Sequence, residues 1–193
     1  VTIKHRIGVD DFDSYEFLTD FVGTVAAAGC ETFIVHARKA WLKGLSPKQN
    51  REIPELDYGR VYQLKQDFPE LEIIINGGIT DLEQSKQHLT QIDGVMIGRE
   101  AYTNPYLLAE VDQQIYGSEN SIQSRKKVAE EFIQYVDNEL SQNIKLQSMT
   151  RHILGLFHGM PGARQFRRHI SENAHQPDAT IDVLIEALDK TTG

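Results

Sequence analysis

The sequence predicts an α/β region with a parallel sheet over residues 1–117, followed by a small all-helical region over residues 118–193. Short apolar, β-branched runs alternate with helix-like patterns in the first region. This alternation is typical of parallel strands that are joined by right-handed crossovers. Beyond residue 117 the strand-like runs stop, and a polar junction, SENSIQSRKKV, precedes four segments with helical periodicity.

Four segments have the composition of strands. They are 1–7 (VTIKHRI), 32–37 (TFIVHA), 71–77 (LEIIING) and 94–99 (GVMIGR). The last three are near-continuous apolar runs, which are typical of parallel strands with both faces covered. We therefore expect a sheet with both of its faces covered.

Helices are expected between and after these strands. Asp13 and Glu16 form a capping box, which predicts a helix through Ala28. Apolar periodicity predicts the others, at about 58–68 and 81–90 in the first region and at 122–140, 144–158, 162–173 and 180–190 in the second. Either Thr80 or Asp81 can serve as the N-cap of the helix at 81–90.

The composition excludes several classes of protein. Apolar residues make up 40% of the 193 and charged residues 25%, which is typical of a globular chain rather than a disordered one. No run of 18 apolar residues exists, and the first residues lack the charge pattern of a signal peptide. The single cysteine, Cys30, excludes an intramolecular disulfide and a cysteine-built zinc site, and fits a reducing compartment such as the cytoplasm.

The net charge of −8 hides an uneven distribution. Residues 36–51 and 145–169 together hold ten of the 20 Lys and Arg residues and no acidic residue. A polyanion is attracted by the local concentration of one sign of charge, not by the total. The two basic segments therefore indicate a nucleic-acid partner. The alternative is that both are ordinary solvated stretches.

Polar and cationic side chains gather where the four predicted strands end, which is where parallel α/β folds place their sites. The ends carry Lys4-His5-Arg6, His36-Ala37-Arg38, Asn76-Gly77-Gly78 and Gly98-Arg99. Glycines after the last two strands let backbone N–H groups approach an anion, and Arg99 can clamp the same phosphate. Each motif alone is an ordinary turn, but together they predict a phosphate site.

The phosphate site also indicates the architecture. In (β/α)8 barrels such a site often lies between the loops after strands seven and eight. The last two predicted strands have this chemistry, and four strands are half of what such a barrel needs. The sequence therefore predicts the C-terminal half of a (β/α)8 TIM barrel. The alternative is a complete, small, doubly wound domain.

Lys4 and His36 indicate the class of cofactor. A reduced flavin carries negative charge, so a cation held beside its ring favours reduction and hydride chemistry. Lys4 projects from a strand and can supply that cation, and His36 can hydrogen-bond ring or phosphate oxygens. The alternative for His36 is a hydrogen-bonded core histidine.

Other candidate sites are weaker. Asp10, Asp11 and Asp13 lack a matching ligand cluster, and the spacing of the later histidines fits no zinc motif, so no metal site is expected. Cys30 precedes a strand and so lies at the end of the sheet away from the predicted site. We therefore expect no role for it as a nucleophile or acid.

Several stretches resemble the flavin-dependent tRNA-dihydrouridine synthases. They are VTIKHRIG, TFIVHARKAWLKGLSPKQNREIP, IIINGGI and GVMIGREAYTNPYLL, and the second is most similar to the A subfamily. The resemblance covers essentially the whole chain. It implies an FMN-binding barrel followed by a helical domain, which together bind tRNA. It also implies that NADPH reduces FMN and that uridine is reduced to 5,6-dihydrouridine in the D-loop, at positions 20 and 20a.

The resemblance also implies roles for individual residues. It assigns Lys4 and His36 to the flavin, and Asn76, Gly77, Gly78, Gly98 and Arg99 to its phosphate end. The tRNA contacts that it implies are Arg38, Lys39, Lys48, Arg51, Arg164 and Arg167.

The sequence departs from the family in one respect. The family's proton donor is a cysteine in an N-C-P-S-like motif, and this sequence has no such motif. The resemblance covers about 60% of a family member, which is somewhat longer than a whole barrel. We therefore expect an inactive C-terminal fragment of a monomeric enzyme, and the open barrel edges of such a fragment can allow it to self-associate. The alternatives are an FMN-barrel oxidoreductase acting on a small molecule, such as a dihydroorotate-type enzyme, and a noncatalytic RNA-binding module.

Overall fold

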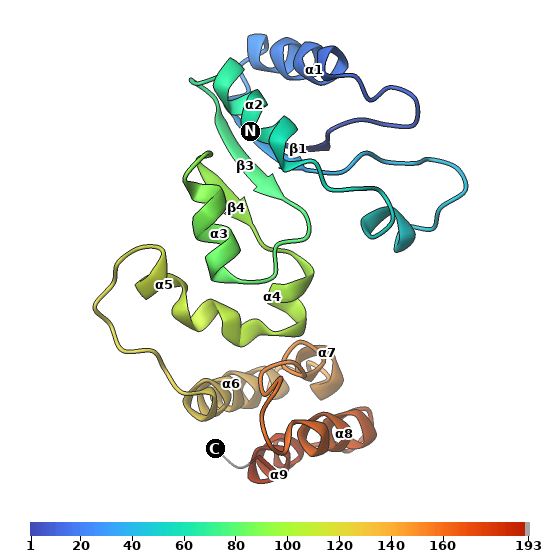
Figure 1. Cartoon of the computed structure of the whole chain (residues 1–193). Coiled ribbons are helices and arrows are strands. Elements are labelled where there is room, and N and C mark those ends of the chain that lie inside the picture. The colour runs from blue at the N-terminus through green and yellow to red at the C-terminus, as the bar shows by residue number, and fades with distance from the viewer. Residues whose placement is uncertain (192–193) are drawn as a thin grey trace. The chain divides into compact units, whose positions relative to one another are not determined.

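The chain consists of two compact units, Val1–Gly98 and Arg99–Gly193, in a computed structural model that describes residues 1–191. Figure 1 draws the first unit in blue to green and the second in yellow-green to red. The second unit starts earlier than the boundary expected at residues 117 and 118. Its first helical segments pack with the later helices: Tyr106 lies against the helical core, and the guanidinium of Arg125 lies 4.0 Å from the centre of its ring.

The first unit contains a four-stranded parallel sheet, which confirms the predicted parallel α/β organisation. Its strands are β1 (Thr2–Arg6), β2 (Thr32–His36), β3 (Glu72–Asn76) and β4 (Gly94–Met96), in the order β1-β2-β3-β4. This order has no reversal, whereas a doubly wound sheet reverses at its switch point. The observed order therefore does not support the doubly wound alternative.

Helices α1 (Tyr15–Ala27), α2 (Tyr58–Asp67) and α3 (Leu82–Leu89) follow the first three strands (Figure 1). The N-cap of α1 is Ser14, whose hydroxyl accepts a hydrogen bond from the Phe17 amide at 3.1 Å. The expectation that Asp13 caps this helix is therefore wrong. The Asp13 carboxylate instead pairs with the Lys39 ammonium at 2.6 Å. For α3, Asp81 is the N-cap and Thr80 is not.

The core of the first unit lies on one face of the sheet. Burial alternates along β2 and β3: Phe33, Val35, Ile73 and Ile75 are fully buried. They pack in one cluster with Leu18 and Val22 of α1 and Val61 and Leu64 of α2. Side chains on the opposite pleat, such as His36, are only half-buried. Within Val1–Gly98, no helix layer covers that pleat, so this unit by itself shows one covered face where two were expected.

The second unit is helical. Its elements are α4 (Arg99–Thr103), η2 (Pro105–Glu110), α5 (Val111–Gln114), α6 (Arg125–Leu140), α7 (Leu146–Thr150), α8 (Ala163–Asn173) and α9 (Asp182–Asp189). They enclose a second core that includes Val136, Phe166 and Leu184. Across residues 1–191, none of the helices is both long and apolar enough to cross a membrane.

The helix expected at 144–158 is shorter than predicted. Only α7 is helical, and turns follow it through residue 159. Gly155 explains part of this difference, since a Cβ there would lie 2.2 Å from the Thr103 carbonyl oxygen. The segment is shaped by its close approach to the end of α4, a long-range contact that sequence periodicity does not report.

Candidate functional site

The register of the sheet brings the predicted strand ends into one row. Arg6, His36 and Asn76 occupy equivalent positions at the ends of β1, β2 and β3, and Met96 pairs with Asn76 on β4. The structure therefore places three of the sequence-predicted strand ends side by side. In parallel sheets, this is the edge at which ligands bind.

A chain of hydrogen bonds runs across this edge. Lys4 Nζ donates to Asn76 Oδ1 at 2.8 Å, and Asn76 Nδ2 donates to the Met96 carbonyl oxygen at 2.7 Å. The two bonds fix the amide of Asn76 from both sides. Lys4 and Asn76 thus form one arrangement that links β1, β3 and β4.

The turn after β3 is tightly packed, and both of its glycines have positive φ. Gly77 has a φ of +117°, and a Cβ there would lie 2.6 Å from His36 Cδ2. Gly78 has a φ of +72°, and its Cβ would lie 2.5 Å from Leu56 Cδ1. Tyr58 donates from its hydroxyl to the Gly77 carbonyl oxygen at 2.8 Å. The backbone of this turn is therefore held close beneath the His36 ring.

The turn after β4 starts beside the same group. A Cβ on Gly98 would lie 3.9 Å from Asn76 Nδ2, so Gly98 and the Gly77–Gly78 turn belong to one edge of the sheet. Arg99 is the first residue of α4, in the second unit. Of the predicted phosphate-site residues, the first unit therefore brings together Asn76, Gly77, Gly78 and Gly98.

The edge is electrostatically positive. Burial lowers the pKa of Lys4, and the nearby charge of Arg6 lowers it further. Burial likewise lowers the pKa of Arg6, with added repulsion from Arg38 and Arg51. Within residues 1–191, neither Lys4 nor Arg6 forms an ion pair with a carboxylate. An anion bound at this edge would relieve the repulsion among these cations.

The predicted RNA-contacting residues of the loop after β2 differ in what they already bind. Arg38 donates to the backbone carbonyl oxygens of Glu52, at 3.2 Å, and of Pro54. Lys39 pairs with Asp13 and lies 4.2 Å over the Trp41 ring. Lys48 and Arg51 are exposed and have no ion-pair partner in the part of the chain that the structure describes. Arg38 and Lys39 therefore shape the loop, whereas Lys48 and Arg51 are available to a ligand.

In the second unit, the two predicted RNA-contacting arginines lie on α8. Arg164 is exposed and Arg167 is half-buried, and neither pairs with an acidic side chain among residues 1–191. Arg168, the next residue, pairs with Glu172 at 2.7 Å. Helix α8 therefore carries one arginine that is ion-paired and two that have no ion pair among residues 1–191.

Three residues that build the site in the first unit were given no individual role by the sequence. Arg6 donates to the Lys39 and Asn50 carbonyl oxygens, both at 2.9 Å, and so fixes the loop to the end of β1. The Asn50 side chain closes the loop by bonding both backbone groups of Trp41. Tyr58 holds the Gly77 carbonyl. Only Arg6 had a sequence signal, its place at a strand end.

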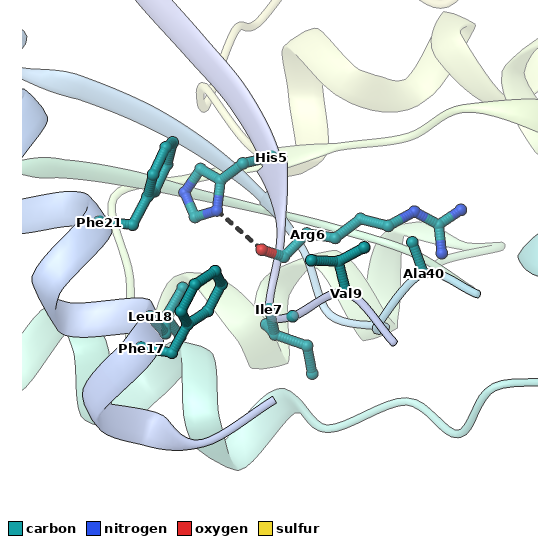
Figure 2. Close-up of a pocket in the computed structure, with 9 residues that line it drawn as sticks. His5, Arg6, Ile7, Val9, Phe17, Leu18, Phe21 and Ala40 are labelled. Carbon is teal, nitrogen blue, oxygen red and sulfur yellow. Dashed lines mark hydrogen bonds between the residues drawn. The ribbon is translucent and has the colours of Figure 1, made fainter. Parts of the chain in front are cut away.

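A separate cavity of about 240 Å³ lies beside β1, and Figure 2 shows the residues that line it. Phe17 and Phe21 of α1 line it together with His5, while the Arg6 side chain extends away from those rings. His5 Nδ1 bonds the Arg6 carbonyl oxygen at 3.0 Å, and its Nε2 is buried with no hydrogen-bond partner among the described residues 1–191. Burial lowers the pKa of His5. Because His5 is on the opposite pleat from Lys4, this cavity is not part of the strand-end site.

The described residues contain no cluster of side chains suited to a metal ion. Among residues 1–191, no group of three His, Cys, Asp or Glu side chains is arranged to hold a metal ion. Cys30 is buried at the start of β2, with its Sγ 3.5 Å from the carbonyl oxygens of Val1 and Thr32. The strand-end site therefore consists of cations, amides, a histidine and backbone.

A parallel α/β unit with cationic, glycine-lined strand ends has the features of folds that bind anionic ligands at the carboxyl edge of the sheet. A family model described as dihydrouridine synthase (Dus) matches residues 1–192, and the chain belongs to this family.

Curated relatives agree with this assignment. The chain is 64% identical over 191 residues to a tRNA-dihydrouridine(20/20a) synthase of Vibrio cholerae, which covers 98% of this chain and 58% of the relative. Proteins of the same name from Vibrio vulnificus and Escherichia coli K12 are 62% and 60% identical, covering 98% and 97% of this chain and 59% and 55% of the relatives. The chain thus spans less than two thirds of the length of these relatives.

Proposed function

We propose that this chain forms the C-terminal part of a tRNA-dihydrouridine synthase that reduces uridines 20 and 20a of the D-loop to 5,6-dihydrouridine. FMN would be its cofactor and NADPH the source of electrons. The family match and the names of the relatives support this reaction. The sequential strand order and the helices on one face of the sheet support the second half of a (β/α)8 barrel.

One observation carries the proposal: the Gly77–Gly78 turn lies directly beneath His36, beside the Lys4–Asn76–Met96 hydrogen-bond chain. A flavin phosphate needs backbone N–H groups and cations, and this edge supplies both. The residues therefore fit FMN. Lys4 and His36 would hold the ring system, and the phosphate end would contact the residues Asn76, Gly77, Gly78, Gly98 and Arg99. When bound, a flavin supplies the hydride that reduces the C5–C6 double bond of uracil.

Lys4 would act as a fixed positive charge. Its ammonium group has three donors, of which Asn76 Oδ1 takes one. The remaining donors are available to negative charge on the flavin, and the bond to Asn76 restricts where they point. Burial and Arg6 disfavour the charged form of Lys4, so an anionic cofactor would stabilise it.

The proton that reduction also requires would come from outside this chain. The only cysteine, Cys30, lies at the opposite end of β2 from His36, roughly 20 Å away at about 3.3 Å per residue. It is buried and cannot reach a substrate at the strand ends. We therefore propose that the chain by itself binds cofactor and RNA but does not complete the reaction.

Binding of tRNA must offset the cost of exposing a stacked uridine, which is a few kcal/mol. We assign this role to the basic residues Lys48, Arg51, Arg164 and Arg167, while Arg38 and Lys39 hold the loop that carries the first two. Folded RNA is recognised mainly by shape and backbone, which suits cations on two different elements. A small-molecule reductase has no need for such cations.

Titration of the chain with FMN, followed by flavin fluorescence, tests the cofactor site. We expect Lys4→Ala to weaken FMN binding and Lys86→Ala to leave it unchanged, because Lys86 is a half-buried residue of α3 that is already paired with Glu83. Arg164→Ala should weaken tRNA binding without changing the flavin spectrum. Equal FMN affinities of the Lys4 and Lys86 variants would overturn the cofactor assignment.

The reaction is tested with the longer protein, NADPH and an unmodified tRNA transcript. Dihydrouridine at positions 20 and 20a is the expected product. Reduction of a free pyrimidine without turnover of the transcript would instead establish the small-molecule oxidoreductase.

A further inference from the structure

Tyr58, the first residue of α2, reaches the turn that follows β3. Its hydroxyl donates a hydrogen bond to the Gly77 carbonyl oxygen at 2.8 Å. The same hydroxyl oxygen lies 3.1 Å from the position that a Cβ on Gly78 would take. The side chain of Tyr58 therefore holds the backbone of the turn whose N–H groups the strand-end site offers to an anion.

The bond to Tyr58 fixes the direction of the next amide group. The Gly77–Gly78 peptide is trans, and in a trans peptide the C=O and N–H groups point in opposite directions. Because the Gly77 carbonyl faces the Tyr58 hydroxyl, the Gly78 N–H faces away from it. Gly78 is exposed, and among residues 1–191 neither glycine N–H donates to an acceptor. The turn therefore presents an oriented backbone donor that is available to a ligand.

The Tyr58 hydroxyl is suited to this contact because it stays protonated. Burial raises the pKa of the Tyr58 hydroxyl, an effect that the nearby charge of Arg38 opposes and Tyr62 reinforces. A carbonyl oxygen can only accept a hydrogen bond, so the phenol must keep its hydrogen to bind Gly77. The contact is therefore in place throughout the neutral pH range.

Tyr58 is itself fixed from two sides. Its ring lies edge to face against the buried ring of His88 of α3, with the centres 4.5 Å apart, and the Tyr62 hydroxyl bonds His88 Nδ1 at 2.7 Å. On the backbone, the Asp57 N–H donates to the Ala37 carbonyl oxygen at 2.8 Å, which joins the start of α2 to the end of β2. The position of the Tyr58 hydroxyl is therefore set by α2, α3 and β2 together.

Leu56 also contacts the turn, but its contact differs in kind. A Cβ on Gly77 would lie 3.1 Å from Leu56 Cδ2, and one on Gly78 would lie 2.5 Å from Leu56 Cδ1. Methyl groups limit how closely the turn can approach them, but they do not select the direction of a carbonyl group. Within the part of the chain that the structure describes, Tyr58 is the side chain that bonds the Gly77 carbonyl.

We infer that Tyr58 is a positioning residue for the phosphate of FMN. Its hydroxyl holds the Gly77–Gly78 peptide in the orientation in which the Gly78 N–H can donate to that phosphate. The inference rests on the proposed function, which supplies the phosphorylated cofactor. A donor that is already oriented loses little freedom on binding, and a hydrogen bond to a charged acceptor is stronger than one to a neutral acceptor. Tyr58 acts through the backbone rather than by contact with the cofactor.

The test compares the binding of FMN and of riboflavin, which lacks the phosphate, to the 193-residue chain and to two variants. Tyr58→Phe should weaken FMN binding roughly tenfold, the loss of one hydrogen bond to a charged group, and change riboflavin binding less than about twofold. Tyr62→Phe is the matched control, because it removes a hydroxyl from the same helix and breaks the bond to His88 but not the bond to the turn. It should leave the preference for FMN over riboflavin unchanged.

A measurement on the unaltered chain keeps the test decisive if Tyr58→Phe alters the fold. The amide proton of Gly78, followed by NMR, should move downfield when FMN is added and stay in place when riboflavin is added. A Gly78 signal that responds equally to the two flavins would overturn the inference. Urea denaturation followed by Trp41 fluorescence checks that both variants remain folded.

Two outcomes separate the inference from the proposed function. Equal losses of FMN affinity in Tyr58→Phe and Tyr62→Phe, or a parallel loss of FMN and riboflavin in Tyr58→Phe, would make Tyr58 a structural residue and leave the proposed function standing. Equal affinity of the unaltered chain for FMN and riboflavin, or binding of neither, would overturn both, because the strand ends would then contribute nothing to phosphate binding.

Discussion

Replacement of Gly77 by alanine tests the geometry on which the cofactor site depends. The φ of Gly77 is +117°, a conformation that side chains with a Cβ rarely adopt. The new methyl group would lie 2.6 Å from His36 Cδ2, 3.0 Å from His36 Nε2 and 3.1 Å from Leu56 Cδ2. Gly77→Ala therefore combines backbone strain with a steric clash against a second predicted site residue.

The two effects can be added. Backbone strain of this kind costs about 1–3 kcal/mol, and forcing a neighbouring side chain off its rotamer costs about 0.5–1.5 kcal/mol. We expect Gly77→Ala to lower the free energy of unfolding of the first unit by about 2–4 kcal/mol. Gly29→Ala is the matched control. Gly29 has a φ of +96°, and a Cβ there would have no neighbouring heavy atom within 4 Å in the part of the chain that the structure describes, so it should show strain alone.

Urea denaturation followed by tryptophan fluorescence measures this difference. Trp41 is the only tryptophan of the chain and lies in the first unit, so its signal reports on that unit. At an m-value of about 2 kcal/mol per molar, the midpoint of Gly77→Ala should fall by roughly 1–2 M. If Gly77→Ala is no more destabilising than Gly29→Ala, His36 does not pack on this turn and the proposed flavin contact loses its basis.

Three other outcomes follow from the structure. In the longer protein, Lys4→Ala should slow uridine reduction far more than it weakens tRNA binding, and equal losses in the two assays would contradict its role beside the flavin. Ser14→Ala should destabilise the first unit by about 1 kcal/mol in urea denaturation, more than Asp13→Ala does, because Ser14 is the N-cap of α1; the reverse order would restore Asp13 as the cap. Burial lowers the pKa of His88, whose Nδ1 bonds the Tyr62 hydroxyl at 2.7 Å, so the His88 ring binds a proton more readily in the unfolded chain than in the folded one. The contribution of His88 to the free energy of unfolding is complete above the unfolded-state pKa of about 6.5 and is lost as the pH falls from there through the lower folded-state pKa. Thermal melts between pH 7.5 and 5.5 should therefore show a smaller decline for His88→Gln than for the unaltered chain, and an equal decline would exclude His88 as the titrating group.

The order and type of the elements in the first unit could be predicted because local patterns determine them. The strand-like runs at 32–37 and 71–77 contain β2 and β3, and Asp81 caps α3 as one of two candidates. The cap of α1 could not be predicted from its capping-box spacing. The choice between Asp13 and Ser14 depends on Lys39, which binds the Asp13 carboxylate from 26 residues further along the chain.

The helix expected at 144–158 shows the same limit in the second unit. Its apolar periodicity is real, since Leu146, Met149, Ile153 and Phe157 are all buried. The backbone nevertheless leaves the helix after Thr150, where Gly155 packs on Thr103. Periodicity indicates which side chains are buried, but it does not report a close approach between segments that are distant in sequence.

The number of basic residues in the sequence overestimates how many of them can contact RNA. This changes the expected salt dependence of RNA binding. The two basic segments hold ten Lys and Arg residues, but three of them are already engaged within their own units. Arg38 binds backbone carbonyl oxygens, Lys39 binds Asp13, and Arg168 binds Glu172. Seven cations remain, which corresponds to a salt slope of about 5–6, whereas ten contacts would give about 7–9. A measured slope of about 7–9 would show that RNA displaces these internal partners. It would then be wrong that Arg38, Lys39 and Arg168 are unavailable to RNA.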